Sequence, residues 1–205
     1  DLKFGYTVRI RPEGAAFRIV VDLDAPLPAE WIGRVGFNFE FFPGLLFGKS
    51  FTADSGSGIF PPQPNGPGVL DPAGEYQPAP LATGRTLIVA PEDDSLRTTI
   101  RCDDGGTLEL VDGRAQHSNG WFVVRSTVAA GATTSAINWL VSPHALPGFR
   151  SAPVVQVSQV GYHPAQPKWA IVELDRTDTR RFPVVVSRVG ADGLLEPVLE
   201  AKAEE

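Results

Sequence analysis

The stretch VVQVSQVGYHP, residues 154–164, decides how this chain is divided. It follows the chain-breaking pair Pro147–Gly148, and it opens an extended run that we expect to continue through Val160. Gly161 then permits a backbone bend, and Pro164 prevents the run from continuing because proline cannot donate to a strand ladder. We therefore expect a second domain to begin at this stretch.

The length and composition of the chain agree with such a division. With 205 residues, of which 42% are hydrophobic, the chain is long enough for one large all-β domain or two smaller ones. The change in pattern near Ala152 favours two domains, so we predict an N-terminal β-sandwich over residues 1–152. Residues 153–205 are then the first part of a second sandwich.

Short alternating segments separated by turn residues run through the first domain, which is typical of an antiparallel sandwich. The first pair of segments predicts a hairpin. The expected strands are 4–10, 17–23, 34–42, 86–89, 98–101, 107–111, 121–127 and 135–141. In the strand over 34–42, Phe37, Phe39 and Phe41 share one face, while Asn38 and Glu40 lie on the other.

The segment over residues 52–84 differs in composition from the rest of the first domain. Seven of the 19 prolines of the chain lie between Pro61 and Pro80, with glycines among them. We predict a long irregular loop packed on the strand over residues 34–42, because a free linker would have little reason to carry apolar residues. The expected apolar anchors are Ile59, Phe60, Val69, Leu70 and Tyr76.

The second domain shows four strand patterns, over residues 154–160, 169–174, 182–189 and 194–199. An immunoglobulin-like sandwich has about seven strands. We therefore expect residues 153–205 to be an incomplete immunoglobulin-like module that further strands complete.

At this point the sequence resembles a known family. Residues 157–164, VSQVGYHP, followed by 167–172, PKWAIV, are similar to the opening of the immunoglobulin-like module that precedes the catalytic barrel in glycoside hydrolase family 9 cellulases. Residues 36–51 and 119–126 resemble the extra N-terminal β-module of some bacterial members. The resemblance implies an accessory region of an exported enzyme that cleaves β-1,4-glucans, with its catalytic domain elsewhere in the same polypeptide.

Charge and composition exclude some partners. The net charge of −6 argues against nucleic acid, because phosphate backbones demand clustered Lys and Arg. No apolar run approaches the roughly 20 residues that span a bilayer. The chain begins at Asp1 and contains no Met, which suggests removal of an initiator or signal peptide, or numbering that starts inside a longer chain. We expect an extracellular or periplasmic location.

Three Asp pairs are candidates for glycosidase carboxylates, which such enzymes need on both sides of the scissile bond. The pairs are Asp22/Asp24, Asp93/Asp94 and Asp103/Asp104. Each lies at a strand end or turn, where Asp is favoured because its side chain bonds nearby backbone amides. The sequence also lacks the Asp-Ala-Gly-Asp motif and the barrel helices of the family, so we expect no catalytic residue in this chain.

The sequence contains only weak signals for a metal site or a catalytic nucleophile. His117, His144 and His163 are isolated from one another and from the single cysteine, Cys102, so we expect no metal and no cofactor. The turn over residues 103–106, DDGG, could offer oxygens to Ca²⁺, but a hairpin turn is the favoured interpretation. Residues 55–58, SGSG, lack the strand-to-helix context of a nucleophile elbow.

Aromatic and charged residues give the better functional hint. Trp31, Phe42, Tyr76 and Trp121 are aromatic candidates for stacking on sugar rings, although Phe122 and Trp139 should belong to the core. Charged residues within apolar strand patterns mark a cleft, a domain contact or plain solvent exposure. The candidates for carbohydrate binding or domain contact are Glu40, Phe42, Lys49, Tyr76, Trp121 and Arg125.

Three hypotheses follow. The first is an accessory region that buttresses a catalytic barrel and extends its glycan-binding surface. The second is an independent carbohydrate-binding module, which exposed coplanar aromatic rings would favour, whereas a buried Trp121 and an apolar patch on the second domain would favour the first. The third is an enzyme built on the first sandwich, which requires convergent carboxylates about 5 to 10 Å apart.

Overall fold

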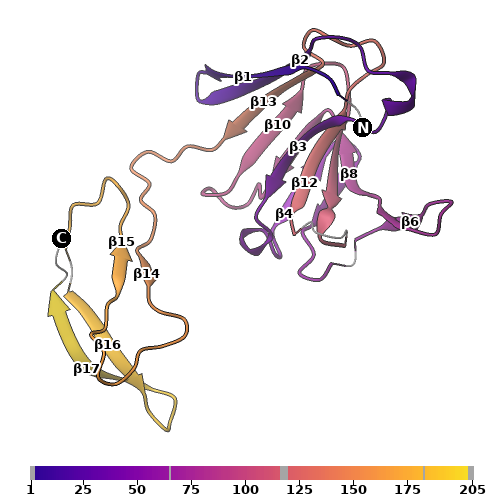
Figure 1. The fold of residues 1–205 in the computed structure, drawn as a ribbon. Helices are drawn as coiled ribbons and strands as arrows, with labels where there is room; N and C mark the ends of the chain where they lie inside the picture. Colours follow the sequence, from indigo (N-terminus) through magenta and orange to yellow (C-terminus); the bar gives the residue numbers. More distant parts are fainter. Residues whose placement is uncertain (1–2, 65, 116–119, 182, 203–205) are drawn as a thin grey trace. The chain divides into compact units, whose positions relative to one another are not determined.

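The computed structural model of the protein describes residues 3–64, 66–115, 120–181 and 183–202. In these ranges all paired strands are antiparallel, and the helices are three single turns, η1 (Ala29–Trp31), η2 (Pro43–Leu45) and η3 (Gly113–Ala115). The predicted all-β, antiparallel fold is therefore confirmed. The chain divides into two compact units, unit 1 (Asp1–Leu146) and unit 2 (Pro147–Glu205) (Figure 1).

Two sheets build unit 1. The larger has seven strands in the spatial order β1 (Tyr6–Glu13), β2 (Ala16–Leu23), β13 (Ile137–Pro143), β10 (Thr98–Cys102), β9 (Thr86–Val89), β4 (Ser50–Ala53) and β5 (Gly56–Ile59). The smaller has the order β3 (Gly36–Phe41), β12 (Phe122–Thr127), β11 (Leu108–Asp112) and β8 (Pro80–Gly84). A separate hairpin pairs β6 (Gly68–Leu70) with β7 (Tyr76–Pro78).

The core lies between these two sheets, because alternate residues of each strand point to the same side. Trp139 of β13 is fully buried and meets Phe37 of β3 edge-on, with 5.3 Å between the ring centroids. Its indole Nε1 donates to the Ser126 hydroxyl of β12 at 3.2 Å, so the buried N–H has a partner. Contacts from both sheets therefore converge on one tryptophan.

The strands predicted from alternation are largely confirmed. The hairpin expected over residues 4–23 is β1 and β2, and each later expected strand of unit 1 overlaps one of β3 and β9–β13. In β3 the phenylalanines are half-buried on the core side, while Asn38 and Glu40 are exposed. Phe122 and Trp139 belong to the core, as expected.

The irregular loop predicted over residues 52–84 is wrong. This segment contains half of β4 and the whole of β5, β6, β7 and β8. Only Phe60 of the five expected anchors is buried, and it packs on Phe51 and Phe122 instead of on the outer strand β3. The other four anchors are exposed: Ile59, Val69, Leu70 and Tyr76. Short Gly- and Pro-rich strands escape a search for apolar alternation, because their ladders depend mainly on backbone hydrogen bonds.

The hairpin predicted at residues 103–106 is also wrong, because this turn carries the chain from one sheet to the other. It joins β10 of the larger sheet to β11 of the smaller sheet. Gly105 has a φ of 88°, a conformation that side chains disfavour, and Asp104 Oδ1 accepts the Gly106 amide at 2.8 Å. The turn chemistry was recognisable, but local residues do not reveal which sheet the next strand joins.

Unit 2 has four strands in two antiparallel pairs. β14 (Val154–Gln156) pairs with β15 (Ile171–Glu173), and β16 (Pro183–Val189) pairs with β17 (Leu195–Lys202). The extended run expected through Val160 stops earlier: a turn follows β14, in which the Gly161 amide donates to the Ser158 carbonyl at 3.2 Å. Gly161 has a φ of 81°, which explains why glycine occupies this position.

Unit 2 begins at Pro147, a few residues before the boundary expected from sequence. The Ser151 amide donates to Asp175 Oδ2 at 2.9 Å, so the segment before β14 is bonded to the loop that follows β15. Some residues singled out from the sequence lie outside the described ranges: Asp1, His117, Asn119 and Phe182.

Candidate functional site

The outer face of the four-stranded sheet brings together four of the six candidate residues. Glu40 of β3 lies opposite Val123 of β12, and Arg125 lies opposite Asn38. Phe42 directly follows β3 and Trp121 directly precedes β12, so both lie at the same end of this strand pair. Because directly opposed residues in an antiparallel pair share a face, these side chains form one surface.

Two aromatic rings stand at one end of this surface. The rings of Phe42 and Trp121 lie with centroids 5.6 Å apart and planes at 60°. Phe42 is 60% exposed and Trp121 is 37% exposed, so both reach solvent. The rings are tilted and do not form a flat platform, but together they offer an exposed apolar corner.

A row of polar side chains crosses the same sheet. Asn38 of β3, Arg125 of β12, Glu109 of β11 and Thr83 of β8 are successive cross-strand partners. Arg125 Nε donates to Glu109 Oε2 at 2.8 Å, and each of these two side chains is more than a third exposed. The row therefore presents hydrogen-bonding groups to solvent, and the opposite charges of Arg125 and Glu109 cancel at its centre.

Asn38, Glu109 and Thr83 also belong to this surface, although they were not among the residues predicted from the sequence. Asn38 was assigned to the outer face of its strand, and Glu109 lies between Leu108 and Leu110, so each had an alternation signal. What the sequence could not give is the register that aligns β3, β12, β11 and β8.

Lys49 lies elsewhere, just before β4 of the seven-stranded sheet. Its Nζ forms an ion pair with Asp93 Oδ2 at 2.8 Å, and this bond raises the pKa of Lys49. Asp93 also accepts hydrogen bonds from the amide and hydroxyl of Ser95, and its pKa lies well below the ordinary range, chiefly because of Lys49. Lys49 thus fixes the turn over residues 90–95.

Tyr76 also has a local structural role. Its hydroxyl donates to the Gly66 carbonyl at 2.9 Å, and its ring lies over Gly68 on the paired strand β6. Trp31, the remaining aromatic candidate, is half-buried in η1. Tyr76 belongs to the separate β6–β7 hairpin and Trp31 to η1, so neither is part of the four-stranded sheet.

The carboxylates considered for catalysis are mostly engaged in the scaffold. Hydrogen bonds from Arg101, then from Arg18, lower the pKa of Asp103 to about 2. The Ser135 amide is the main cause of the lowered pKa of Asp22, with Arg9 contributing. Carboxylates held ionised in this way are poor proton donors at neutral pH. Asp22 and Asp103 instead act in the scaffold, where their bonds stabilise turns and strand ends.

Asp104 and Asp94, from two of the pairs, are also bonded to neighbouring residues. Asp104 accepts from the Asn138 amide at 2.8 Å, and Asp94 forms an ion pair with Arg97 at 2.9 Å. Asp104 also accepts from Cys102 Sγ; burial first, and this bond second, raise the pKa of Cys102 to about 12. The buried thiol is thus held in its unreactive protonated form.

The remaining chemical signals are explained locally. His144 Nδ1 lies 2.9 Å from the Asp94 carbonyl, His163 Nδ1 accepts from the Ala165 amide, and Ser55 Oγ accepts from the Thr83 amide. Among the described residues, no group of three or more His, Cys, Asp or Glu could hold a metal ion. The described helices are all single turns, and none has the length and hydrophobicity needed to cross a membrane.

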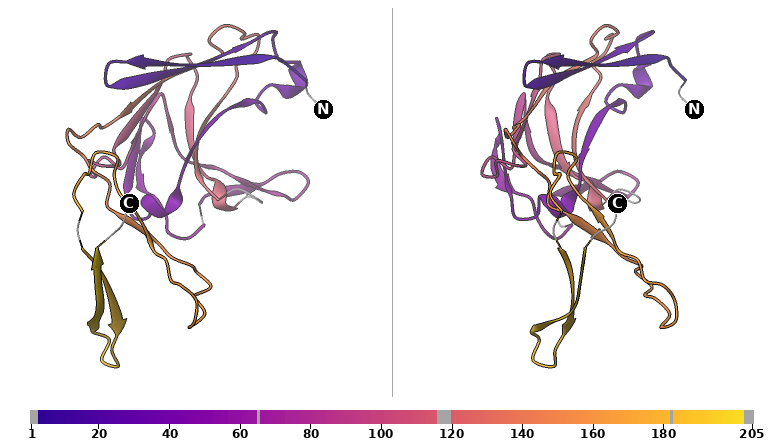
Figure 2. Two further views of the ribbon diagram at one scale, coloured as in Figure 1. Left: turned by 60° about the vertical axis from the view of Figure 1, so that its left-hand side comes forward. Right: turned by 90° about the vertical axis from the view of Figure 1, so that its left-hand side faces the viewer.

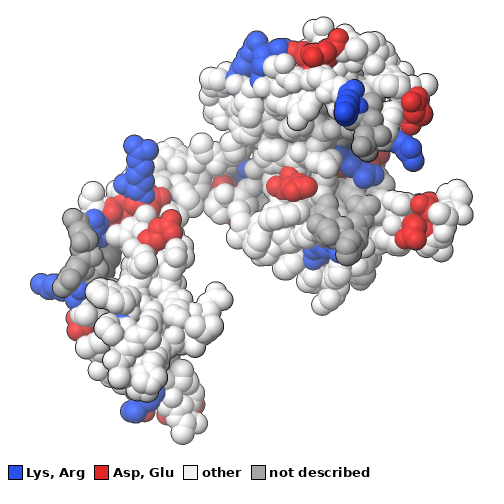
Figure 3. Space-filling view, in the orientation of Figure 1, with Lys and Arg blue, Asp and Glu red and all other residues white. Residues whose placement is uncertain are grey.

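Charge is mixed over the visible surface. On the face drawn in Figure 3, Lys and Arg are interspersed with Asp and Glu, and no large patch of one sign is visible. Comparisons of the sequence with protein-family models, with curated proteins and with solved structures gave no match.

Proposed function

We propose that this chain is the N-terminal accessory region of a glycoside hydrolase family 9, cellulase-like enzyme that acts on β-1,4-glucans outside the cytoplasm. Unit 1 is the accessory β-sandwich, and unit 2 is the first part of an immunoglobulin-like module. The chain supplies no catalytic residue and needs no cofactor. It buttresses a catalytic domain of the same polypeptide and extends the glycan-binding surface of that domain.

The observation that carries this proposal is the uncovered apolar surface of unit 2. Large apolar side chains of all four strands are exposed, including Val155, Ile171, Val186 and Leu199. Full burial of such a side chain contributes about 1.5 to 3 kcal/mol, so a pair of two-stranded sheets with these faces in water is poorly stabilised. Further sandwich strands and a neighbouring domain would cover them, as the resemblance at residues 157–172 implies.

The test uses the full polypeptide from which this chain comes. Leu199→Lys places a charge on the face shared with Val186, its cross-strand partner, whereas Glu200→Lys changes the opposite face of β17. We expect Leu199→Lys to destabilise the module by about 2 kcal/mol in thermal melts, and Glu200→Lys to have little effect.

Two results would count against the proposal. One is a full polypeptide that contains no glycosidase barrel. The other is an equal melting temperature for the Leu199→Lys and Glu200→Lys variants. The 205-residue chain alone should not hydrolyse soluble β-glucan. Hydrolysis by the purified chain that persists after removal of contaminating enzymes would instead support an enzyme built on unit 1.

A second candidate function, an independent carbohydrate-binding module, is favoured by the exposed Phe42–Trp121 corner beside the polar row. Calorimetry with cello-oligosaccharides tests it. Trp121→Ala should weaken binding about five- to tenfold, because an aromatic contact contributes about 1 kcal/mol. Phe149→Ala removes an exposed aromatic of unit 2 and is the control. Absence of binding by the unaltered chain would eliminate this candidate.

A further inference from the structure

The smaller sheet of unit 1 ends at β3, and this end is open. β3 forms a ladder with β12 on one side, and no described strand pairs with its other side. Its sequence, GFNFEF, contains no proline, lysine or arginine, residues with which proteins blunt an exposed sheet edge, and its one charged side chain is that of Glu40. The backbone groups on the outer side of β3 are therefore available for pairing.

The other three terminal strands of the two sandwich sheets are protected. β1 carries Arg9, Arg11 and Pro12. The edge of β8 is covered by the turn between β4 and β5, where Ser55 exchanges hydrogen bonds with Thr83. β5 is glycine-rich and is followed by two prolines. Among the edge strands of these two sheets, β3 is the longest that contains no proline, lysine or arginine.

An apolar groove adjoins the open edge. Tyr6, Val8 and Ile10 of β1 lie opposite the buried residues Leu23, Val21 and Ile19 of β2, so they share the core-facing side of the larger sheet. They nevertheless remain 62%, 43% and 67% exposed. The larger sheet extends past β3, and in Figure 2 the β1–β2 hairpin reaches beyond the body of the sandwich.

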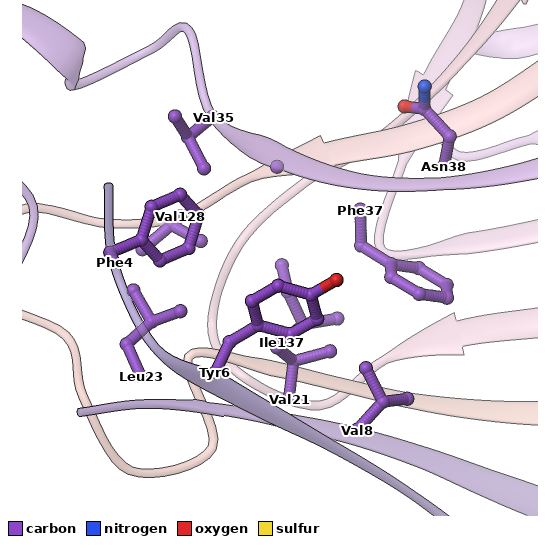
Figure 4. Close-up of a pocket in the computed structure, with 11 residues that line it drawn as sticks. Phe4, Tyr6, Val8, Val21, Leu23, Val35, Phe37, Asn38, Val128 and Ile137 are labelled. Atoms are coloured by element: carbon purple, nitrogen blue, oxygen red, sulfur yellow. The ribbon is translucent and has the colours of Figure 1, made fainter. Parts of the chain in front are cut away.

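The groove between β1 and β3 has a volume of about 380 Å³. Figure 4 shows Phe4 and Tyr6 on one side of it and Phe37 on the other. Apart from Asn38 and the Tyr6 hydroxyl, its side-chain lining is apolar. A strand added beside β3 would place its core-facing side chains in this groove.

Three kinds of occupant can be compared. A small apolar molecule would fill the groove but leave the β3 backbone unpaired. If two copies paired antiparallel through β3, the β1 strand of each copy would have to lie over the β3 strand of the other copy. The two β1 strands would then have to occupy the same space. A parallel pair would turn the polar side chains Asn38 and Glu40 toward the partner's groove. An extended segment of another polypeptide satisfies both the edge and the groove.

Charge specifies that segment further. Glu40 is exposed on the outer face of β3 and has no ion-pair partner in the part of the chain that the structure describes. A basic residue opposite Glu40 on the added strand would complete a cross-strand pair. We propose that β3 and the groove beneath β1 bind an extended segment of a partner protein, with apolar residues at alternate positions and a basic residue on its outward face. This inference is independent of the proposed enzymatic context.

The test uses the whole chain and a labelled peptide in which valine alternates with threonine, one threonine being replaced by lysine. Fluorescence anisotropy measures binding. Val8→Lys charges the groove and should weaken binding at least tenfold, while Thr7→Lys, on the other face of the same strand, should leave it unchanged. Glu40→Gln should weaken binding by a smaller factor. Because Val8 and Thr7 are exposed, unchanged melting curves should show that both Lys variants fold.

A second peptide separates strand pairing from simple filling of the groove. The same sequence methylated on every backbone amide keeps its side chains but cannot donate to β3, so it should not bind. Equal binding of both peptides would overturn strand addition. Absence of binding by the unmethylated peptide would also overturn the inference, as would a concentration-dependent dimer that Val8→Lys abolishes, because the occupant would then be a second copy.

Discussion

At the scale of single residues, Arg114 shows how one side chain can hold an otherwise weakly packed segment. Its guanidinium forms two hydrogen bonds with the carboxylate of Asp112, which is 1% exposed. It also donates to the carbonyls of three successive residues, Pro61, Pro62 and Gln63, and lies over the ring of Phe122 at 4.5 Å from the centroid. The chain after β5 is thus tied to β11 by a side chain that is itself nearly buried.

Arg114→Ala should therefore destabilise unit 1 by about 3 kcal/mol, because it leaves the buried Asp112 carboxylate without its counter-ion. Urea denaturation measures the change. Arg34→Ala, at an exposed position, is the control and should change stability by about 0.5 kcal/mol or less. If the two variants unfold at the same urea concentration, Arg114 does not hold this segment.

At the scale of elements, strand existence was more predictable than strand pairing. The half-buried phenylalanines of β3 and the alternation in β13 gave clear patterns, and both strands were found where expected. The strands between residues 52 and 84 were missed because few of their side chains enter the core. The polar row of the candidate site depends on pairing across four strands, which no local pattern contains. Phe42 and Trp121 were expected to stack on sugar rings together with Trp31 and Tyr76, but the surface that they share with Glu40 and Arg125 was not predicted.

Phe60 provides the sharpest test at this scale, because it is the one buried apolar anchor of the segment. It is 0% exposed and meets Phe51 and Phe122 edge-on, at 5.1 and 4.8 Å between centroids. Phe60→Ala should cost about 3 to 5 kcal/mol. The neighbouring Ile59 is 64% exposed, so Ile59→Ala should cost less than about 1 kcal/mol. Similar melting temperatures for the two variants would contradict the assigned packing.

At the scale of the whole molecule, the two units differ in how well they are buried. Unit 1 contains all the residues of the hydrophobic core cluster, whereas the large apolar side chains of unit 2 are mostly exposed. We expect residues 1–146 alone to melt cooperatively, and residues 147–205 alone to aggregate or remain unfolded, because two-stranded sheets are marginal in water. A cooperative melt of the second fragment by calorimetry would refute this, and would remove the need for covering strands.

The pairing of β2 with β13 has a consequence for how the protein is made. Arg18 of β2 donates to Asn138 of β13 at 2.8 Å across 120 residues of chain. The N-terminal hairpin thus leaves the ribosome long before the strand that it pairs with, and the larger sheet cannot close until nearly all of unit 1 has been synthesised. Sheets whose paired strands lie far apart in the sequence fold slowly. Until the larger sheet closes, the apolar side of the first hairpin is uncovered, and during this time binding by chaperones protects the chain most from aggregation.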